Sequence, residues 1–276
     1  MFKAGGTYRL SQGIQLANRT GLTLDGNGAT LRTTGTGNLA SLIILGHRYG
    51  GAWGGTNRNI TIRGFVLAGA QPSPVLTAYE HQHGIQVENS VGVQIANMTV
   101  RGVYGDGIKV GSNETSNVWF HDSRIESAGR NAVTVTAGSN ITAERLTIGS
   151  VGYCVFDVEP NTSSAAARNV IFRDSTAVSW ANVFVAVEGA HTGATIDGVT
   201  VSGVSISGKS LFTVIDNGGT SRMKNITVTN NSSAVKAAGP VLRFAHIDGL
   251  TVTGNVQPLS SGALASITDC TGVTYR

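Results

Sequence analysis

The sequence predicts an all-β fold in which the chain winds into a parallel β-helix, a solenoid of about 9–10 coils. Three observations support this prediction. A short phrase of alternating apolar residues returns from one end of the chain to the other, and the composition is rich in Gly, with 37 residues, and in Val, Ile and Thr within the repeats. In addition, no window keeps apolar residues at i, i+3, i+4 and i+7 over a helical length, which excludes a solenoid of helices.

The repeated phrase is Gly or Asn followed by residues that alternate between apolar and polar. Successive copies start 38, 33, 25, 23, 29, 29, 27, 24 and 23 residues apart, the period of a solenoid coil with insertions in the early and middle turns. One such strand cannot bury its apolar side alone, so we expect parallel sheets around a continuous core, with the leading Asn residues in turns and Asn ladders. The ten copies begin at Gly21, Asn59, Gly92, Asn117, Asn140, Asn169, Gly198, Asn225, Gly249 and Gly272.

The 276 residues are expected to form a single β-helix domain, 1–276, with no N-terminal cap before Thr7. The charges that make up the net charge of +4 are scattered, so no nucleic-acid partner is expected, and no apolar run is long enough for a membrane span. The chain enters its first strand within a few residues, without a visible signal peptide. Cys154 and Cys270 lie about five coils apart, roughly 24 Å, and are expected to be free.

A second apolar phrase precedes the first in most coils, and its outward residues are expected to build a flat wall. Carboxylates, a Lys, an Arg and a Tyr on a rigid sheet are residue types that grip or cleave a sugar chain. Asp106, Arg130, Asn131 and Tyr153 enter this wall from the preceding turns. Stacking the phrases gives one exposed column of Gln86, Lys109, Thr134, Asp157, Ala186 and Arg243, and a second column of Glu88, Gly111, Thr136, Glu159 and Glu188.

Asp157 and Glu159 are the leading candidates for an acid and base pair. They stand at i and i+2 of one strand, so both project from the same face about 6.5–7 Å apart. Glu188 follows one coil later, and repulsion among these carboxylates needs a cation, a shared proton or a substrate to offset it. The predicted catalytic group also includes Asp106 and Lys109. Lys109 lies two coils from Asp157, a distance of about 10 Å. The competing interpretation is an ordinary solvated strand face.

Two insertions, 46–58 and 71–83, interrupt the repeat beside this wall and are expected to form one rim of a groove. The competing interpretation is that they only cap one end of the solenoid. The spacing of His81 and His83 is weak evidence for a metal pair, and no metal site is predicted. The residues predicted to bind substrate are Arg48, Trp53 and His83 from the insertions, together with Gln86, Arg130, Asn131, Tyr153 and Glu188.

From about Gly6 to Tyr275, the chain resembles the pectate-lyase-like superfamily of right-handed single-stranded parallel β-helices. Thr7-Tyr-Arg-Leu and the segment 22–31 look like the opening coils of that group. Asp106-Gly-Ile-Lys109 is similar to an aspartate motif of polygalacturonases, whereas the next coil has Asn131-Ala-Val-Thr in place of that family's aspartate pair, and no Gly-His-Gly follows. Phe156-Asp-Val-Glu-Pro-Asn161 is similar to an acidic phrase of bacterial β-helix proteins. The resemblance implies carbohydrate handling.

Three functions remain open at this point. The leading hypothesis is a polysaccharide-cleaving glycoside hydrolase, extracellular or on a cell or virion surface, that needs no cofactor. The first alternative is a lyase that cleaves a uronic-acid polymer by β-elimination, with Lys109 or Tyr153 as base, Arg130 neutralising the substrate and the carboxylates holding Ca²⁺. The second alternative is a binding protein, such as a tailspike or surface adhesin, whose wall only grips sugar.

Overall fold

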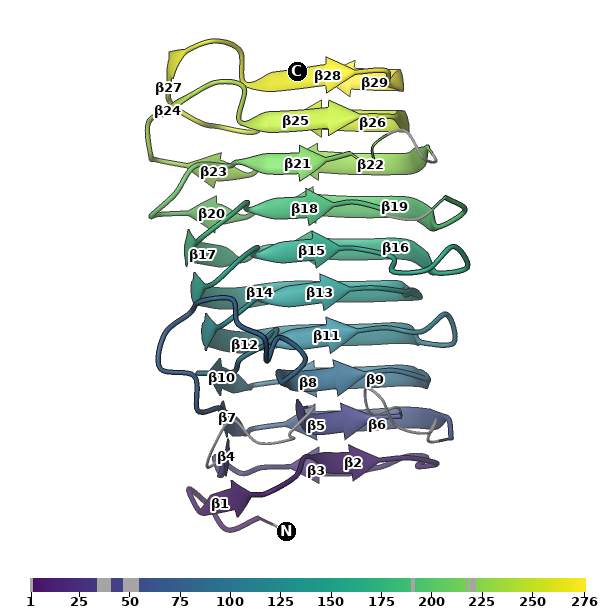
Figure 1. Cartoon of the computed structure of the whole chain (residues 1–276), viewed down its shortest axis with the longest axis vertical. Helices are drawn as coiled ribbons and strands as arrows, with labels where there is room; N and C mark the ends of the chain where they lie inside the picture. Colours follow the sequence, from purple (N-terminus) through teal and green to yellow (C-terminus); the bar gives the residue numbers. More distant parts are fainter. Residues whose placement is uncertain (1, 34–40, 47–54, 190–191, 217, 219–221) are drawn as a thin grey trace.

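The computed structural model describes residues 2–33, 41–46, 55–189, 192–216, 218 and 222–276. Within these ranges it contains 29 strands and no helix. The strands pair in parallel from coil to coil and stack into a β-solenoid of about nine turns, with the two termini at opposite ends of the long axis (Figure 1). No helix that could cross a membrane occurs in the part of the chain that the structure describes.

A full coil presents three strands, one on each side of the solenoid. The wall sheet holds β2 (Ile14–Leu16), β5 (Ser41–Leu45), β8 (His83–Val87), β11 (Ile108–Val110), β13 (Val133–Val135), β15 (Phe156–Val158), β18 (Val185–Val187), β21 (Thr213–Ile215), β25 (Leu242–Ala245) and β28 (Ala265–Thr268). The second sheet holds β3 (Thr23–Asp25), β6 (Asn57–Arg63), β9 (Ser90–Ala96), β12 (Ser116–Ala128), β14 (Gly138–Val151), β16 (Ala166–Arg173), β19 (Thr195–Ser202), β22 (Met223–Thr229), β26 (Ile247–Thr253) and β29 (Thr271–Tyr275).

The third sheet was not identified from the sequence. Its separate strands are only two to five residues long, and the C-terminal halves of β12 and β14 run on into it from the second sheet. A strand this short carries too little alternation to be recognised as a repeat. The third sheet holds β1 (Thr7–Leu10), β4 (Thr30–Thr33), β7 (Val66–Ala68), β10 (Thr99–Arg101), β17 (Thr176–Trp180), β20 (Ser205–Ile206) and β23 (Ser232–Ser233), while β24 (Ala237–Ala238) pairs with β27 (Leu259–Ser261).

The residue that opens each copy of the repeat has a left-handed backbone conformation. All ten leading residues have positive φ, from 49° at Asn169 to 81° at Gly249. Gly and Asn adopt this conformation at the least cost, which explains why only these two types occur there. The amide of Asn140 donates to Asn117 at 3.0 Å, and that of Asn169 donates to Asn140 at 2.9 Å. The predicted turn residues and Asn ladder are therefore confirmed.

A continuous apolar core runs through the solenoid, with members from Leu16 to Val252. Beneath the middle of the wall sheet, the rings of Phe156 and Phe172 stack with centroids 5.0 Å apart. At the N-terminal end of the solenoid, the Phe2 ring packs edge-on against the Phe65 ring, with centroids 4.9 Å apart. The expected lack of an N-terminal cap stays a prediction.

The two cysteines are free, as predicted. Cys154 lies in a small apolar cluster with Val183 and Ala186, separate from the main core. Ala186 belongs to the outward column of the wall sheet, so this part of the wall is apolar and lies next to the acidic part.

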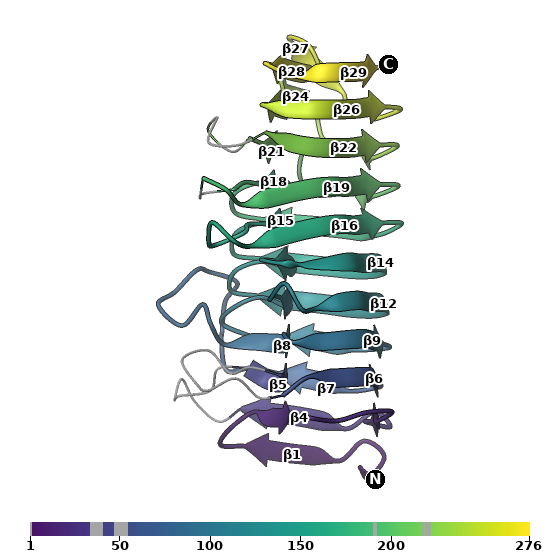
Figure 2. The same cartoon turned by 90° about the vertical axis from the view of Figure 1, so that its right-hand side faces the viewer.

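The insertion 71–83 lies against the edge of the wall sheet. The loop that joins β7 to β8 rises beside the next coils in Figure 1 and projects from the body of the solenoid in Figure 2. Two glycines leave room for it, because a Cβ at Gly152 would lie 2.9 Å from the carbonyl oxygen of Pro74, and one at Gly129 would lie 3.1 Å from that of Val75. Most of the other insertion, residues 47–54, lies outside the described residues.

Candidate active site

The predicted outward column on the wall sheet exists, but most of it is buried. Gln86, Lys109, Thr134 and Asp157 are successive register partners in four neighbouring strands. Their side chains lie outside the apolar core, yet Asp157 is only 1% exposed and Thr134 is fully buried. The prediction of an exposed column is therefore wrong for Gln86, Thr134 and Asp157, whereas the Lys109 side chain is partly exposed. The reason is that neighbouring side chains lie against the column: Ser41 donates a hydrogen bond to Gln86, Asn131 donates to Thr134 and Asp157, and Arg130 lies beside Asp157.

A ladder of buried side chains lines the edge where the wall strands begin. Each member accepts a hydrogen bond from the backbone N–H of the next coil: His83 from Asp106 at 3.0 Å, Asp106 from Asn131 at 3.1 Å, and Asn131 from Cys154 at 2.8 Å. His83, Asp106 and Asn131 are all buried. Asp106 and Asn131, which the sequence suggested for catalysis and substrate binding, thus hold successive turns together and do not face solvent.

Arg130 is the cation at the centre of the acidic cluster. Its guanidinium lies 3.4 Å from Asp106 and 3.6 Å from Asp157. It also lies 3.5 Å from Glu80 and donates a hydrogen bond to Glu159. Arg130 therefore supplies the positive charge that offsets the repulsion between Asp157 and Glu159. Burial acts to lower the pKa of Arg130, but the charges of Asp106 and Glu159 raise it, so this side chain stays protonated.

Asp157 and Glu159 both have a raised pKa. Burial is the main cause for each; the charge of Glu159 adds to the shift of Asp157, while Arg130 opposes both shifts. Asp157 Oδ2 accepts a hydrogen bond from Asn131 Nδ2 at 2.8 Å, but the buried Oδ1 has no partner among the described residues. A buried oxygen without a partner costs less on a neutral carboxyl than on a carboxylate. Asp157 and Glu159 are therefore suited to hold a proton, and the two carboxyl groups titrate together.

Asp106 is shifted in the opposite direction. Burial acts to raise its pKa, but the charge of Arg130 and the hydrogen bond from the backbone N–H of Asn131 hold the pKa below the usual value. The cluster thus combines an ionised interior carboxylate with a neighbouring pair that retains a proton.

A hollow of about 260 Å³ opens beside this cluster. Glu159 is 19% exposed and Glu80 is 41% exposed, whereas Asp157 is not part of the lining, so the first two carboxyl groups are the ones that can meet a ligand. Burial lowers the pKa of His81. The lining combines side chains of the wall sheet with those of the 71–83 insertion: Glu80, His81, His83, Lys109, Arg130, Thr136, Glu159 and Asn161.

Glu80, Thr136 and Asn161 were not predicted as site residues. Thr136 stands in the column of Glu159, and Asn161 follows Glu159 by two positions, so strand alternation carried a signal for both. Glu80 had no such signal. It belongs to the insertion, whose path along the wall depends on tertiary packing.

Lys109 lines the hollow as part of an ion pair. Its Nζ donates to Glu88 Oε1 at 2.6 Å. The ion pair lies close to Gly111, where a Cβ would be 2.8 Å from Thr136 Oγ1 and 3.2 Å from Glu88 Oε1. The absence of a side chain at this position of the second column thus makes room for Thr136 and for the Glu88 carboxylate.

The remaining predicted residues do not line the hollow. Gln86 is buried and accepts a hydrogen bond from Ser41, whereas Glu188 is exposed one coil beyond Glu159. Tyr153 packs at the apolar cluster around Cys154, and burial raises its pKa. Arg48 and Trp53 lie outside the described residues. In the described ranges no group of three or more His, Cys, Asp or Glu is arranged to hold a metal ion.

Replacing Asp157 by Asn is expected to change how stability depends on pH. A carboxyl whose pKa is raised on folding contributes stability at low pH and loses it as pH rises through the folded-state pKa. The Asn variant lacks this contribution, so its free energy of unfolding relative to the wild type should increase between pH 5 and pH 8. Urea denaturation at several pH values measures this, and parallel pH profiles of the two proteins would contradict the assignment.

Residues 49–239, more than half of the chain, match a family model described as "Right handed beta helix region". A search of curated proteins gives no significant match.

Among solved structures, the chain is similar to a family 28 exopolygalacturonase from Yersinia enterocolitica, with a TM-score of 0.66 and 13% identity over 92% of this chain and 46% of that one. It is also similar to endopolygalacturonase I from Stereum purpureum, solved with two galacturonates, with a TM-score of 0.59 and 17% identity over 100% of this chain and 94% of that one. An exopolygalacturonase from Thermotoga maritima gives a TM-score of 0.52 and 13% identity over 84% of this chain and 55% of that one. The chain thus spans about half the length of the first and third of these proteins, and the likeness concerns the fold.

Proposed function

Because this chain belongs to the right-handed β-helix family, we propose that it is a glycoside hydrolase that cleaves a polysaccharide at the hollow beside Arg130 and Glu159. The pectate-lyase-like fold expected from the sequence is the one found. Its structural neighbours include polygalacturonases, and this supports a carbohydrate-active role at the level of the fold. A polysaccharide is the proposed partner, met outside the cell or on a cell or virion surface.

The observation that carries the proposal is a carboxyl group with a raised pKa on the wall of the hollow. Glu159 has this property, and Glu80 places a second carboxyl group on the same guanidinium. Glycoside hydrolysis needs one carboxyl to protonate the leaving oxygen and a second to activate water or attack the sugar. We assign the first role to Glu159 and the second to Glu80. Asp157, which lies behind them, is a positioning residue, since it contacts Asn131 and Arg130.

Hydrolysis fits the contacts better than β-elimination does. An elimination needs a free base and a cation that is open to the substrate carboxylate. Lys109 is bound to Glu88, and Arg130 is surrounded by four carboxyl groups. Tyr153 is outside the hollow, and burial raises its pKa, which makes it a weaker candidate for the base.

A product assay tests the proposal. The protein is incubated with polygalacturonate as an acidic polymer and with xylan and dextran as neutral ones. Products are read as new reducing ends and as the ultraviolet absorbance of an unsaturated sugar. New reducing ends without this absorbance are expected for hydrolysis, and the absorbance would instead establish elimination. Retention on a polymer without any product would favour the binding-protein alternative.

A further inference from the structure

The second sheet carries an exposed tryptophan where its neighbours in the same column are mostly threonines. Trp119, on β12, is 40% exposed. Its register partners on either side, Gln94 and Thr142, are polar and smaller. Toward the N-terminal coils the column continues with Thr61 and Thr23. Toward the C-terminal coils it continues with Ile171, Thr200, Thr227, Thr251 and Thr274.

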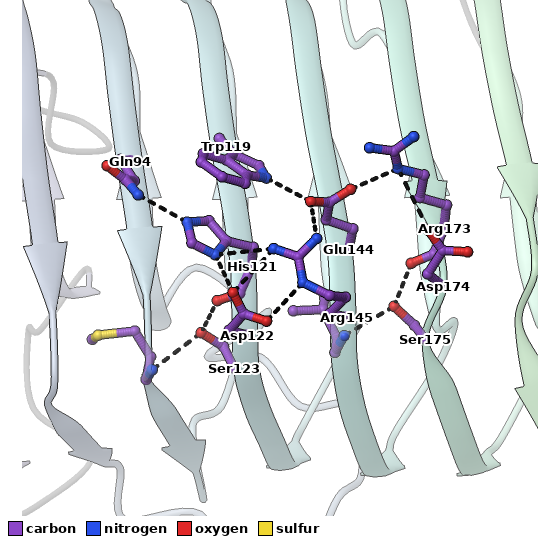
Figure 3. Close-up of polar contacts among 12 residues, drawn as sticks. Gln94, Trp119, His121, Asp122, Ser123, Glu144, Arg145, Arg173, Asp174 and Ser175 are labelled. Carbon is purple, nitrogen blue, oxygen red and sulfur yellow. Dashed lines mark hydrogen bonds and ion pairs between the residues drawn. The ribbon is translucent and has the colours of Figure 1, made fainter.

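The Trp119 ring is fixed on one face and at one edge (Figure 3). Its face stacks on the ring of His121 with centroids 3.7 Å apart and an interplanar angle of 24°. Its indole N–H donates to Glu144 Oε1 at 3.0 Å. Glu144 is itself almost fully buried, and Arg145 and Arg173 both donate to it. The indole is therefore held in one orientation before any ligand arrives.

His121 is held in place by Asp122, the next residue in β12, and by Arg145 of the next coil. His121 Nδ1 lies 2.6 Å from Asp122, and Arg145 donates to the same carboxylate at 2.7 and 3.0 Å. The hydrogen bond from Arg145, followed by that from His121, lowers the pKa of Asp122, so it stays ionised. Gln94 meets the other ring nitrogen of His121 at 3.0 Å. Most of these charges are thus satisfied within the network, which supports the ring and leaves little free charge.

We propose that this surface, the Trp119 platform formed by Gln94, Trp119, His121, Asp122, Glu144, Arg145 and Arg173, is a non-catalytic binding site for a carbohydrate chain. A pyranose ring would stack its apolar face on the exposed part of Trp119. Arg173 contacts Glu144 and Asp174 through Nε, and its two terminal nitrogens make no hydrogen bond with the described residues, so they are available to sugar hydroxyls. The hydroxyl of Thr142 lies in the same column as the indole.

The surroundings of Trp119 favour a sugar over a protein partner. A protein interface needs about 800 Å² on each side and an apolar centre. Here a single indole stands among polar and charged side chains, and Gln94 and Thr142 flank it directly. A sugar ring matches this pattern, because it has one small apolar face surrounded by hydroxyl groups. The extended sheet also offers a flat surface on which a polymer can lie.

This inference does not rest on the proposed hydrolase. The platform is on the second sheet, whereas the hollow is on the wall sheet, so binding at the platform and cleavage at the hollow are separable. A polymer held on the platform would stay close to the protein between cleavage events if the wall cleaves it. If the wall does not cleave, the platform remains a glycan-binding surface.

The test measures binding in the Glu159→Gln background, so that cleavage does not consume the probe. Affinity electrophoresis through gels that contain polygalacturonate, xylan or dextran gives a dissociation constant for each polymer. Trp119→Ala should weaken binding to at least one of them about tenfold or more, and Trp119→Phe should retain most of the affinity. The Trp119→Ala variant should still fold, because Glu144 still accepts hydrogen bonds from Arg145 and Arg173. Val178→Ala is the matched control, since Val178 is 45% exposed on β17 of the third sheet.

Equal retention of Trp119→Ala and its parent in all three gels would overturn the proposal. If the sedimentation coefficient of the variant also changes, Trp119 is a contact between protein chains instead. Turnover of the single variant Trp119→Ala on a short oligosaccharide, measured alongside, should equal that of the wild type. A loss there would place Trp119 in the catalytic site and contradict its separate role.

Discussion

Replacing Glu159 by Gln is expected to lower turnover on the cleaved polysaccharide by about a hundredfold or more, the usual cost of losing a general acid. The amide keeps the size of the side chain and can still accept the hydrogen bond from Arg130, so the fold should persist. In the wild type, activity should fall as pH rises through the raised pKa of Glu159, because the acid must be protonated to donate. Initial rates of reducing-end formation across pH measure both effects.

The control for this variant is Glu126→Gln. Glu126 is a half-buried carboxylate in β12, and it pairs with Arg124 and Arg101 away from the hollow. Its replacement should leave turnover within about twofold of the wild type, as is usual for a side chain that meets no reacting atom. If Glu159→Gln has the turnover and the pH profile of the wild type, Glu159 is not the general acid. The assignment of the active site to this hollow would then be wrong.

Replacing Arg130 by Met is expected to cause the largest loss of stability, about 3–5 kcal/mol. The change leaves Asp106 and Asp157 buried without their cation, and Glu159 loses its hydrogen bond. The loss should be larger at pH 8 than at pH 5, because protonation removes the uncompensated negative charge. Urea denaturation at the two pH values gives the free energies of unfolding.

Arg130→Lys separates charge from geometry. A lysine keeps the positive charge but cannot present several N–H groups in a plane to four carboxyl groups, so this variant should be intermediate in stability. If Arg130→Met unfolds with the wild-type free energy at both pH values, the guanidinium is not what holds the acidic cluster together.

Much of the fold follows from local chemistry that the sequence carries in each repeat. The leading Asn and Gly residues were recognisable because only these types sit at low cost in the left-handed conformation that every coil requires. The register of Lys109 with Asp157 followed from the same repetition, because a strand alternates with period two and the phrases stack. The third sheet escaped notice, since strands such as β20 and β23 have only two residues each.

What only the tertiary structure decided is which of the aligned residues face solvent. The alternation of side chains along a strand shows that a residue points away from the core. It does not show which other side chains cover that residue. Arg130 and the ladder through Asp106 and Asn131 cover Asp157, and the 71–83 insertion brings Glu80 to the hollow. Likewise, the hydrogen bond that orients Trp119 is accepted by Glu144 on the next coil, so it depends on how β12 and β14 pair. Repetition thus determines the scaffold, whereas burial and charge pairing depend on contacts between segments far apart in the chain, which no local pattern encodes.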